Sequence, residues 1–260
     1  MSDALSPAET AGTGRPATEH AAFAKAAGGF YTPVVTLFTA VLIISNICAT
    51  KGIQFFGSFA ENPVKLGPVE ILPLTLDGAF FLFPLAYIIG DVLSEVYGFK
   101  AARRAIYFGF GVLVLMLGCF WIARHLPGGL DPARDAAFDN VLGTTPQLVL
   151  AGLCGYFVGE MLNSATLVAI KERTKEKHLW ARLLGSTVVG EFGDTLIFCA
   201  IAATAIGINS WGTFFNYLIV GFVWKTLAEV LVLPITYRVI AFLKKNEPSY
   251  APVEVEALRS

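Results

Sequence analysis

The stretch RAIYFGFGVLVLMLGCFWIA, residues 104–123, contains no charged side chain after its first residue. An α-helix rises about 1.5 Å per residue, so these residues would span about 30 Å, the thickness of the hydrocarbon core of a bilayer. The composition agrees with a membrane protein. Of 260 residues, 55 % are hydrophobic and 15 % are charged, whereas a soluble domain has about 25 % charged residues. A soluble globular enzyme is therefore excluded.

Five further apolar stretches accompany this one, at about residues 30–50, 78–97, 146–170, 183–206 and 214–243. We predict an all-α polytopic membrane protein with six transmembrane helices in one domain, residues 29–245. The segment 55–76 is too polar, and too often broken by proline, to cross a membrane. Residues 1–28 are rich in Ala, Thr, Gly and Pro without an apolar period, and we predict a disordered cytoplasmic tail there. Residues 246–260 form a second polar tail.

The basic residues predict the orientation. Assigned to alternating sides of six spans, fourteen Lys and Arg residues lie on the side of both termini and four lie on the other side. Loops rich in Lys and Arg remain in the cytoplasm. Both termini are therefore predicted to be cytoplasmic.

Six carboxylates lie within the apolar stretches, where a chain that only had to fold would avoid them. Each ionisable group at the centre of a transmembrane helix costs about 2.5–3.5 kcal/mol on insertion scales. Such residues mark functional sites by default. The carboxylates are Asp91, Glu95, Glu160, Glu191, Asp194 and Glu229, and Asn46, Asn163 and Lys225 add further polarity.

The spacing of these residues predicts a shared polar site. Glu191 and Asp194 are three residues apart and therefore lie on one helix face, as do Glu160 and Asn163. Two alternatives stay open for other members. Lys225 and Glu229, four residues apart, either neutralise each other or take part in coupling.

Glu95 has a similar ambiguity. It either pairs with the nearby basic loop of Lys100, Arg103 and Arg104 or acts as a ligand.

Several activities lack their motifs. No Gly-Lys pair occurs, so the chain has no phosphate-binding loop and no ATPase of its own. The net charge of −1 provides no field for nucleic acid. Neither a metal site nor a cofactor is predicted. GEFGD, residues 190–194, is similar to the GxGD string of intramembrane aspartyl proteases, so an intramembrane acid-pair enzyme is the alternative to a non-enzymatic carrier.

Five strings carry a resemblance to a known family. They are NICATK (46–51), FPLAYIIGDVLSEVYG (83–98), ARRAI (102–106), NSAT (163–166) and RLLGSTVVGEFGDTLIF (182–198). With these strings the chain resembles the queuosine precursor transporter family over roughly residues 30–245. The resemblance implies a multi-pass secondary transporter of the bacterial inner membrane. It would import 7-cyano-7-deazaguanine, 7-aminomethyl-7-deazaguanine or both for queuosine salvage, without an ATPase subunit.

The chemistry of a deazaguanine suits the predicted site. Its N1–H and exocyclic amine are parallel donors that one carboxylate accepts in a fork. We therefore predict Glu191 and Asp194 at the centre, one of them protonated when the site is empty. Asp91 and Glu160 would line it, and Asn46, Asn163 or Lys51 would donate to O6, although snorkelling is the default for Lys51. Candidate stacking partners are Tyr87, Phe192, Phe198, Tyr217 and Trp224. The sequence does not define the oligomeric state and is compatible with a homodimer.

Overall fold

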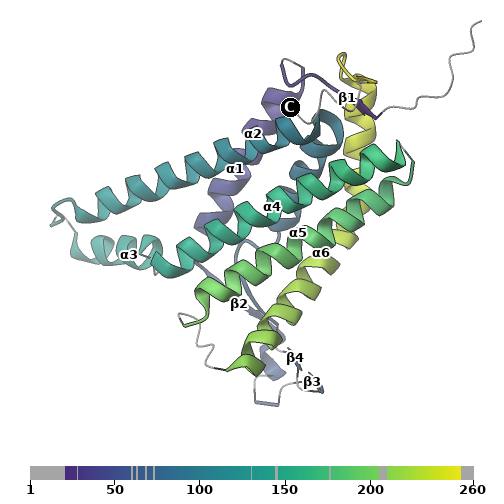
Figure 1. Cartoon of the computed structure of the whole chain (residues 1–260). Coiled ribbons are helices and arrows are strands. Elements are labelled where there is room, and N and C mark those ends of the chain that lie inside the picture. Colours follow the sequence, from purple (N-terminus) through teal and green to yellow (C-terminus); the bar gives the residue numbers. More distant parts are fainter. Residues whose placement is uncertain are drawn as a thin grey trace, which may run out of the picture.

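The computed structural model describes residues 21–27, 29–59, 61–62, 64–67, 69–72, 74–129, 131–143, 146–175, 177–204 and 210–252. Helices dominate these residues (Figure 1). They are α1 (Tyr31–Cys48), α2 (Phe83–His125), α3 (Pro132–Leu142), α4 (Pro146–Thr174), α5 (Leu179–Ala202) and α6 (Trp211–Asn246).

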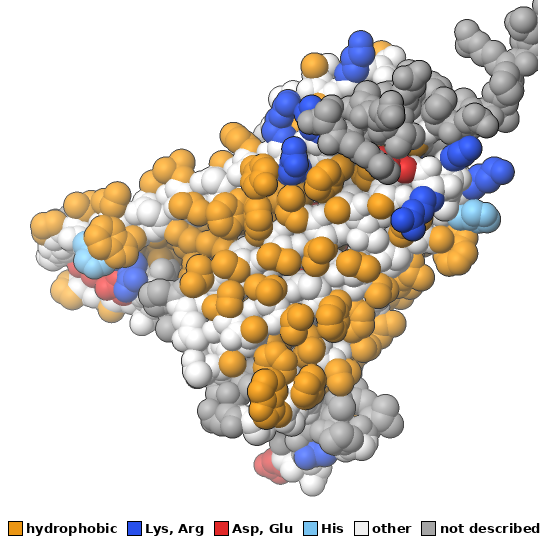
Figure 2. Space-filling view, viewed as in Figure 1, with side chains coloured by type: hydrophobic (Ala, Val, Ile, Leu, Met, Phe, Trp, Pro, Cys, Tyr) orange, Lys and Arg blue, Asp and Glu red, His pale blue; other side chains and the backbone are white. Residues whose placement is uncertain are grey.

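The described residues include five helices that are long and apolar enough to cross a membrane, namely α1, α2, α4, α5 and α6. Large hydrophobic side chains such as Leu115, Trp121 and Leu231 are more than 60 % exposed on them. Figure 2 shows hydrophobic side chains along the face of the helices between two more polar ends. A surface of this kind is stable in lipid. The chain is therefore a multi-pass membrane protein.

Helix α2 joins the second and third predicted stretches into 43 residues, but it contains a break. Gly98 has φ 79° and ψ 171°, a backbone conformation that L side chains rarely adopt. The chain reverses there, so that residues 83–97 and 99–125 are two separate arms. The other four stretches correspond to α1, α4, α5 and α6, each within a few residues of the expected bounds.

The most extensive helix pair is formed by α4 and α5, which lie side by side in Figure 1. Glycines permit their close approach. A Cβ atom at Gly159 would lie 3.0 Å from the carbonyl oxygen of Gly190, and the reverse holds at Gly190. Small residues that let helix backbones approach are typical of membrane interfaces. Helix α2 packs against α4 and α6, and α1 packs against α2.

Short strands qualify the all-α expectation. Strand β2 (Gly52–Phe55) pairs with β5 (Leu74–Asp77), and β3 (Val64–Leu66) pairs with β4 (Val69–Leu72), all antiparallel. These hairpins occupy the connection between α1 and α2 that was predicted not to span. Helix α3 was not expected in the polar loop 124–144. Asp131 caps it, accepting from the backbone N–H groups of Ala133 and Arg134 at 3.1 and 3.3 Å.

Residues 21–27, within the stretch predicted as a disordered tail, and the described part of the polar C-terminal tail are packed on the bundle. Strand β1 (Ala22–Phe23) pairs with β6 (Ala251–Pro252), and Phe23 is 3 % exposed. The apolar side chains of Ala21, Phe23 and Ala24 are buried on the bundle, and this burial stabilises the segment. Residues 1–20 and 253–260 of the predicted tails lie outside the described residues.

The connections divide between two ends of the bundle. The Gly98 break, the α4–α5 connection, the end of α6 and the β1–β6 pair lie at one end (Figure 1). Lys and Arg side chains gather there (Figure 2), and we call it the basic end. Helix α3, the start of α6 and strand β2 lie toward the other end.

Candidate functional site

Five carboxylates are buried in the middle of the bundle, and we call them the acidic cluster. They come from four helices: Asp91 from α2, Glu160 from α4, Glu191 and Asp194 from α5, and Glu229 from α6. Each residue is at most 7 % exposed. A Cβ atom at Gly90, next to Asp91, would lie 2.5 Å from Glu160, and one at Gly159, next to Glu160, would lie 2.7 Å from Cβ of Asp194, so these groups are neighbours. The structure thus brings together residues that are up to 138 positions apart in the sequence, from Asp91 to Glu229.

One carboxylate of this cluster forms a direct hydrogen bond with a neighbouring helix. Asn163 Nδ2 on α4 donates to Asp91 Oδ1 on α2 at 2.9 Å, and both side chains are buried. Three residues further along α2, the hydroxyl of Ser94 lies 2.7 Å from that of Ser164, the residue after Asn163 on α4. These polar contacts tie α2 to α4 in a region where lipid offers no competing partner.

Lys225 of α6 places a cation beside the acidic cluster. Its ammonium contacts the Asp194 carboxylate and lies 3.7 Å from Glu191 Oε2. Tyr87 O–H also donates to Asp194 Oδ2, at 3.3 Å. Glu229 accepts from Thr187 Oγ1 at 2.8 Å. Lys225 therefore pairs with the α5 carboxylates Asp194 and Glu191 rather than with Glu229, which accepts a hydrogen bond from a hydroxyl.

Several acceptor oxygens of this region have no hydrogen-bond donor within the described residues. Both oxygens of Glu160 are in this group, and a Cβ atom at Gly90 would lie 2.5 Å from one of them. The other acceptors are Asn163 Oδ1, Glu191 Oε2 and Glu229 Oε2. A buried polar atom without a partner costs about 1–3 kcal/mol. The cluster is therefore chemically suited to a ligand that presents several N–H donors.

Two predicted members lie elsewhere. Asn46 is exposed, and its amide donates to the Leu42 carbonyl of its own helix at 2.9 Å. Lys51 is exposed in the connection after α1. In this structure, neither residue has a contact that places it with the acidic cluster.

Glu95 is fully buried nearer the basic end. Arg182 of α5 pairs with it through Nε at 3.0 Å and Nη2 at 2.7 Å, and Lys244 of α6 lies 2.6 Å from Oε1. Lys171 of α4 lies 3.4 Å from the same oxygen. These partners come from three helices rather than from the neighbouring loop of residues 100–104.

Sequence reasoning missed the roles of Lys171 and Arg182, which it assigned to topology. A signal was present for Lys171. Residues 160, 164, 167 and 171 recur at helical spacing on one face of α4, and all four are buried. Their shared face would have placed Lys171 inside the bundle.

The five aromatic side chains that were candidates for stacking differ in how deeply they are buried. Tyr87 is 2 % exposed beside Asp194, whereas Phe192 and Tyr217 are 46 % and 49 % exposed. Phe198 and Trp224 are half-buried. Of the five, Tyr87 is the aromatic side chain in contact with the acidic cluster.

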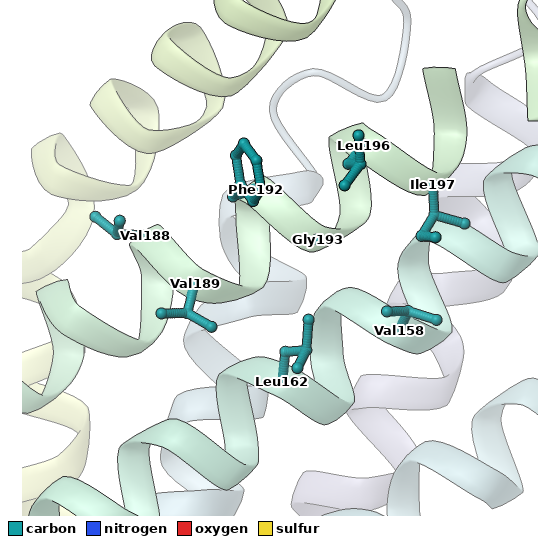
Figure 3. A pocket seen from close by; sticks show the side chains of 8 residues that line it. All are labelled: Val158, Leu162, Val188, Val189, Phe192, Gly193, Leu196 and Ile197. Carbon is teal, nitrogen blue, oxygen red and sulfur yellow. The ribbon is translucent and has the colours of Figure 1, made fainter. Parts of the chain in front are cut away.

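A groove of about 440 Å³ lies on the outer surface between α4 and α5 (Figure 3). Its lining presents no polar side chain, so it is not suited to a hydrogen-bonding ligand. It is lined by Val158, Leu162, Val188, Val189, Phe192, Gly193, Leu196 and Ile197. Among the described residues, no group of three His, Cys, Asp or Glu side chains is arranged to hold a metal ion.

Comparisons with known proteins identify the family. The family model described as "Putative vitamin uptake transporter" matches residues 77–239. Over 195 residues the chain is 25 % identical to the "Probable queuosine precursor transporter" of Bacillus subtilis (strain 168), covering 75 % of this chain and 84 % of the relative. No solved structure matches the chain significantly. The family predicted from the sequence strings is thus confirmed, and the chain belongs to the transporter family described as "Putative vitamin uptake transporter".

Proposed function

We propose that the protein imports a 7-deazaguanine precursor of queuosine, either the 7-cyano or the 7-aminomethyl compound, and that the acidic cluster binds it. The name of the Bacillus subtilis relative supports the substrate class. The observation that carries the site is the surplus of buried acceptor oxygens on Glu160, Asn163, Glu191 and Glu229. A deazaguanine offers N–H donors at N1, at the exocyclic amine and on its five-membered ring.

Glu191 is the proposed acceptor for the edge of the deazaguanine that carries N1–H and the exocyclic amine. Its Oε2 has no hydrogen-bond donor within the described residues but lies 3.7 Å from the Lys225 ammonium, and a carboxylate can accept N1–H and the amine together. Asp194 lies one helix turn away and is engaged by Lys225 and Tyr87. The Tyr87 ring is the proposed stacking face, and stacking contributes about 1–3 kcal/mol per base.

The finer topology is also a proposal. The two arms of α2, at 15 and 27 residues on either side of Gly98, would be the second and third of six spans. Both termini would lie in the cytoplasm, because the basic end carries the excess of Lys and Arg. The transport domain would comprise residues 29–245 in a bacterial inner membrane. A homodimer stays a prediction.

Transport is favoured over acid-pair catalysis by the partner of Asp194. A catalytic carboxyl pair needs two acids that share a proton, whereas Asp194 contacts an ammonium. Purified protein in liposomes separates the two functions. A carrier moves labelled deazaguanine unchanged, and an enzyme returns an altered product.

The decisive experiment uses a bacterium that cannot synthesise queuosine. Cells with and without this gene are fed each precursor, and queuosine in transfer RNA is measured. We expect queuosine only when the gene is present, at precursor concentrations that are limiting. Equal queuosine with and without the gene would contradict the proposal.

A further inference from the structure

A continuous set of buried polar side chains leads from the acidic cluster to the basic end. On α2 it comprises Asp91, Ser94 and Glu95, and on α4 it comprises Asn163 and Ser164. All five residues are at most 1 % exposed. The Asp91–Asn163 and Ser94–Ser164 hydrogen bonds join the two helices along this route. A polar substrate that leaves the cluster toward the basic end would meet Glu95 next.

Glu95 closes this route by joining four helices. Its carboxylate, on α2, pairs with Lys171 on α4, Arg182 on α5 and Lys244 on α6. Lys171 also donates to the backbone carbonyl of Glu95. Ion pairs at helix interfaces can break and form again with other partners, so the interface switches between two discrete arrangements. The four helix ends are thus held together by one anion.

The two ends of the chain cover this ion network from outside. We call residues 21–27 and 247–252 the terminal clamp. Lys171 Nζ donates to the carbonyl of Ala22 at 2.7 Å and lies 4.2 Å from the centroid of the Phe23 ring. It also lies 5.4 Å from the ring of Tyr250. One ammonium therefore contacts Glu95 and both halves of the terminal clamp.

Further contacts attach the clamp to the bundle. Ala24 N–H donates to the Val96 carbonyl at 2.7 Å. Glu247 accepts from the backbone N–H of Phe30 at 3.0 Å and from Tyr97 O–H at 2.9 Å. Although burial raises the pKa of the Glu247 carboxyl, these hydrogen bonds outweigh it, and the pKa lies below its usual value. An ionised Glu247 thus holds the clamp to α2 near neutral pH.

The clamp is nevertheless a small structure. Its strands are two residues each, and the pairs are Ala22 with Pro252 and Phe23 with Ala251. A two-stranded ribbon of this length has little stability of its own. It depends on the burial of Phe23, on the hydrogen bonds of Glu247 with the bundle and on the contacts with Lys171 beneath it, so rearrangement of the Glu95 network would weaken it.

We propose that the terminal clamp and the Glu95 ion network form the gate at the basic end of the transport route, closed in this structure, with Glu95 as its latch. The gate opens when Glu95 exchanges partners and strands β1 and β6 of the clamp separate, and the acidic cluster then communicates with the compartment at that end. This inference rests on the proposed transport function, but its main test needs no substrate.

A reversible cross-link tests the clamp. The background is a variant in which the native cysteines Cys48, Cys119, Cys154 and Cys199 are replaced by alanine. Ala22→Cys and Pro252→Cys are combined, because these residues are paired across β1 and β6. Ser164→Cys, beneath the gate, reports access through its reaction with a membrane-impermeant maleimide in inside-out and right-side-out vesicles. The matched control is Gln54→Cys with Thr75→Cys, paired across β2 and β5 near the other end.

Before oxidation, we expect maleimide to reach Ser164→Cys from the side of the basic end as the gate opens. Oxidation of the clamp pair should abolish this labelling, and a reductant should restore it. Oxidation of the control pair should change neither labelling nor uptake, since β2 and β5 belong to one connection between neighbouring helices. Unchanged labelling after oxidation of the clamp pair would overturn the gate.

A charge-neutral substitution tests the latch independently. Glu95→Gln keeps the size of the side chain but cannot pair with three cations. It should increase labelling of Ser164→Cys from the side of the basic end, whereas Glu61→Gln, exposed in the connection after β2, should not. Labelling equal to that of the parent, in protein with normal expression, would remove Glu95 from the gate.

Uptake of labelled 7-deazaguanine by the same vesicles separates the two proposals. The oxidised clamp pair should reduce uptake to the level of vesicles that lack the protein. If the reduced protein takes up no deazaguanine but its Ser164→Cys labelling still responds to oxidation, the gate stands and the proposed substrate is wrong. If uptake is normal and insensitive to oxidation, the substrate stands and the gate is wrong.

Discussion

Asn163 donates to Asp91 across the α2–α4 interface at 2.9 Å, and its own Oδ1 has no hydrogen-bond donor within the described residues. One amide therefore has two parts with different functions. Its NH₂ group satisfies a carboxylate of the protein, and its oxygen remains able to accept from a ligand. This relationship connects the stability of the helix bundle with its proposed substrate site.

Asn163→Ala should destabilise the protein, because Asp91 Oδ1 would then be buried without a donor. An unsatisfied buried acceptor costs about 1–3 kcal/mol, more when it is charged. Thermal unfolding in detergent measures the effect. A double-mutant cycle with Asp91→Ala should show a coupling of about 0.5–3 kcal/mol, and additive effects would show that the hydrogen bond contributes nothing.

Glu191→Gln should weaken binding of the deazaguanine by about ten- to a hundredfold. The substitution replaces one acceptor oxygen by an amide that faces the ligand's donors, and a hydrogen bond to a charged group contributes about 1.5–3 kcal/mol. Equilibrium binding to detergent-solubilised protein is the measurement. Membrane insertion should be equal or better, because a deep charge is removed.

The neighbouring residue supplies the control for this experiment. Phe192 is 46 % exposed on the outer face of α5, on the lining of the apolar groove. Phe192→Leu should leave binding unchanged. If Glu191→Gln and Asp194→Asn both bind the deazaguanine as the parent does, the acidic cluster is structural and the substrate site lies elsewhere.

Gly98→Ala should destabilise the reversal between the two arms of α2. The φ of 79° is strained for any residue with a Cβ, and the new methyl would lie 3.0 Å from Cδ1 of Phe23. Strain of this kind costs about 1–3 kcal/mol. Gly111→Ala is the matched control in the second arm, since a Cβ there meets nothing within 4 Å. Equal melting temperatures for the two variants would contradict this account of the break.

A reporter fused after Ser260 should be active only in the cytoplasm. The expectation follows from fourteen basic residues on the side of both termini against four on the other. A fluorescent reporter that folds in the cytoplasm and a phosphatase that is active outside it form a complementary pair. Phosphatase activity at this position would reverse the proposed orientation.

The sequence by itself determined the membrane fold, because apolar stretches of about twenty residues have no other stable arrangement. It also identified the buried carboxylates of the interior, since each deep charge is costly enough to be informative in isolation. The family followed from five strings. These conclusions depend on composition, length and local spacing, which are all visible along one chain.

Only the tertiary structure decided which polar residues meet. Glu95 and Arg182 lie 87 positions apart in the sequence and form an ion pair at 2.7 Å, while Asn46 has the expected chemistry but an exposed position. The tail residue Phe23 is buried because Gly98 lacks a side chain and leaves room for its ring. Partner choice between helices depends on their rotation and close approach, and helical spacing specifies which residues share a face but not which neighbour that face will contact.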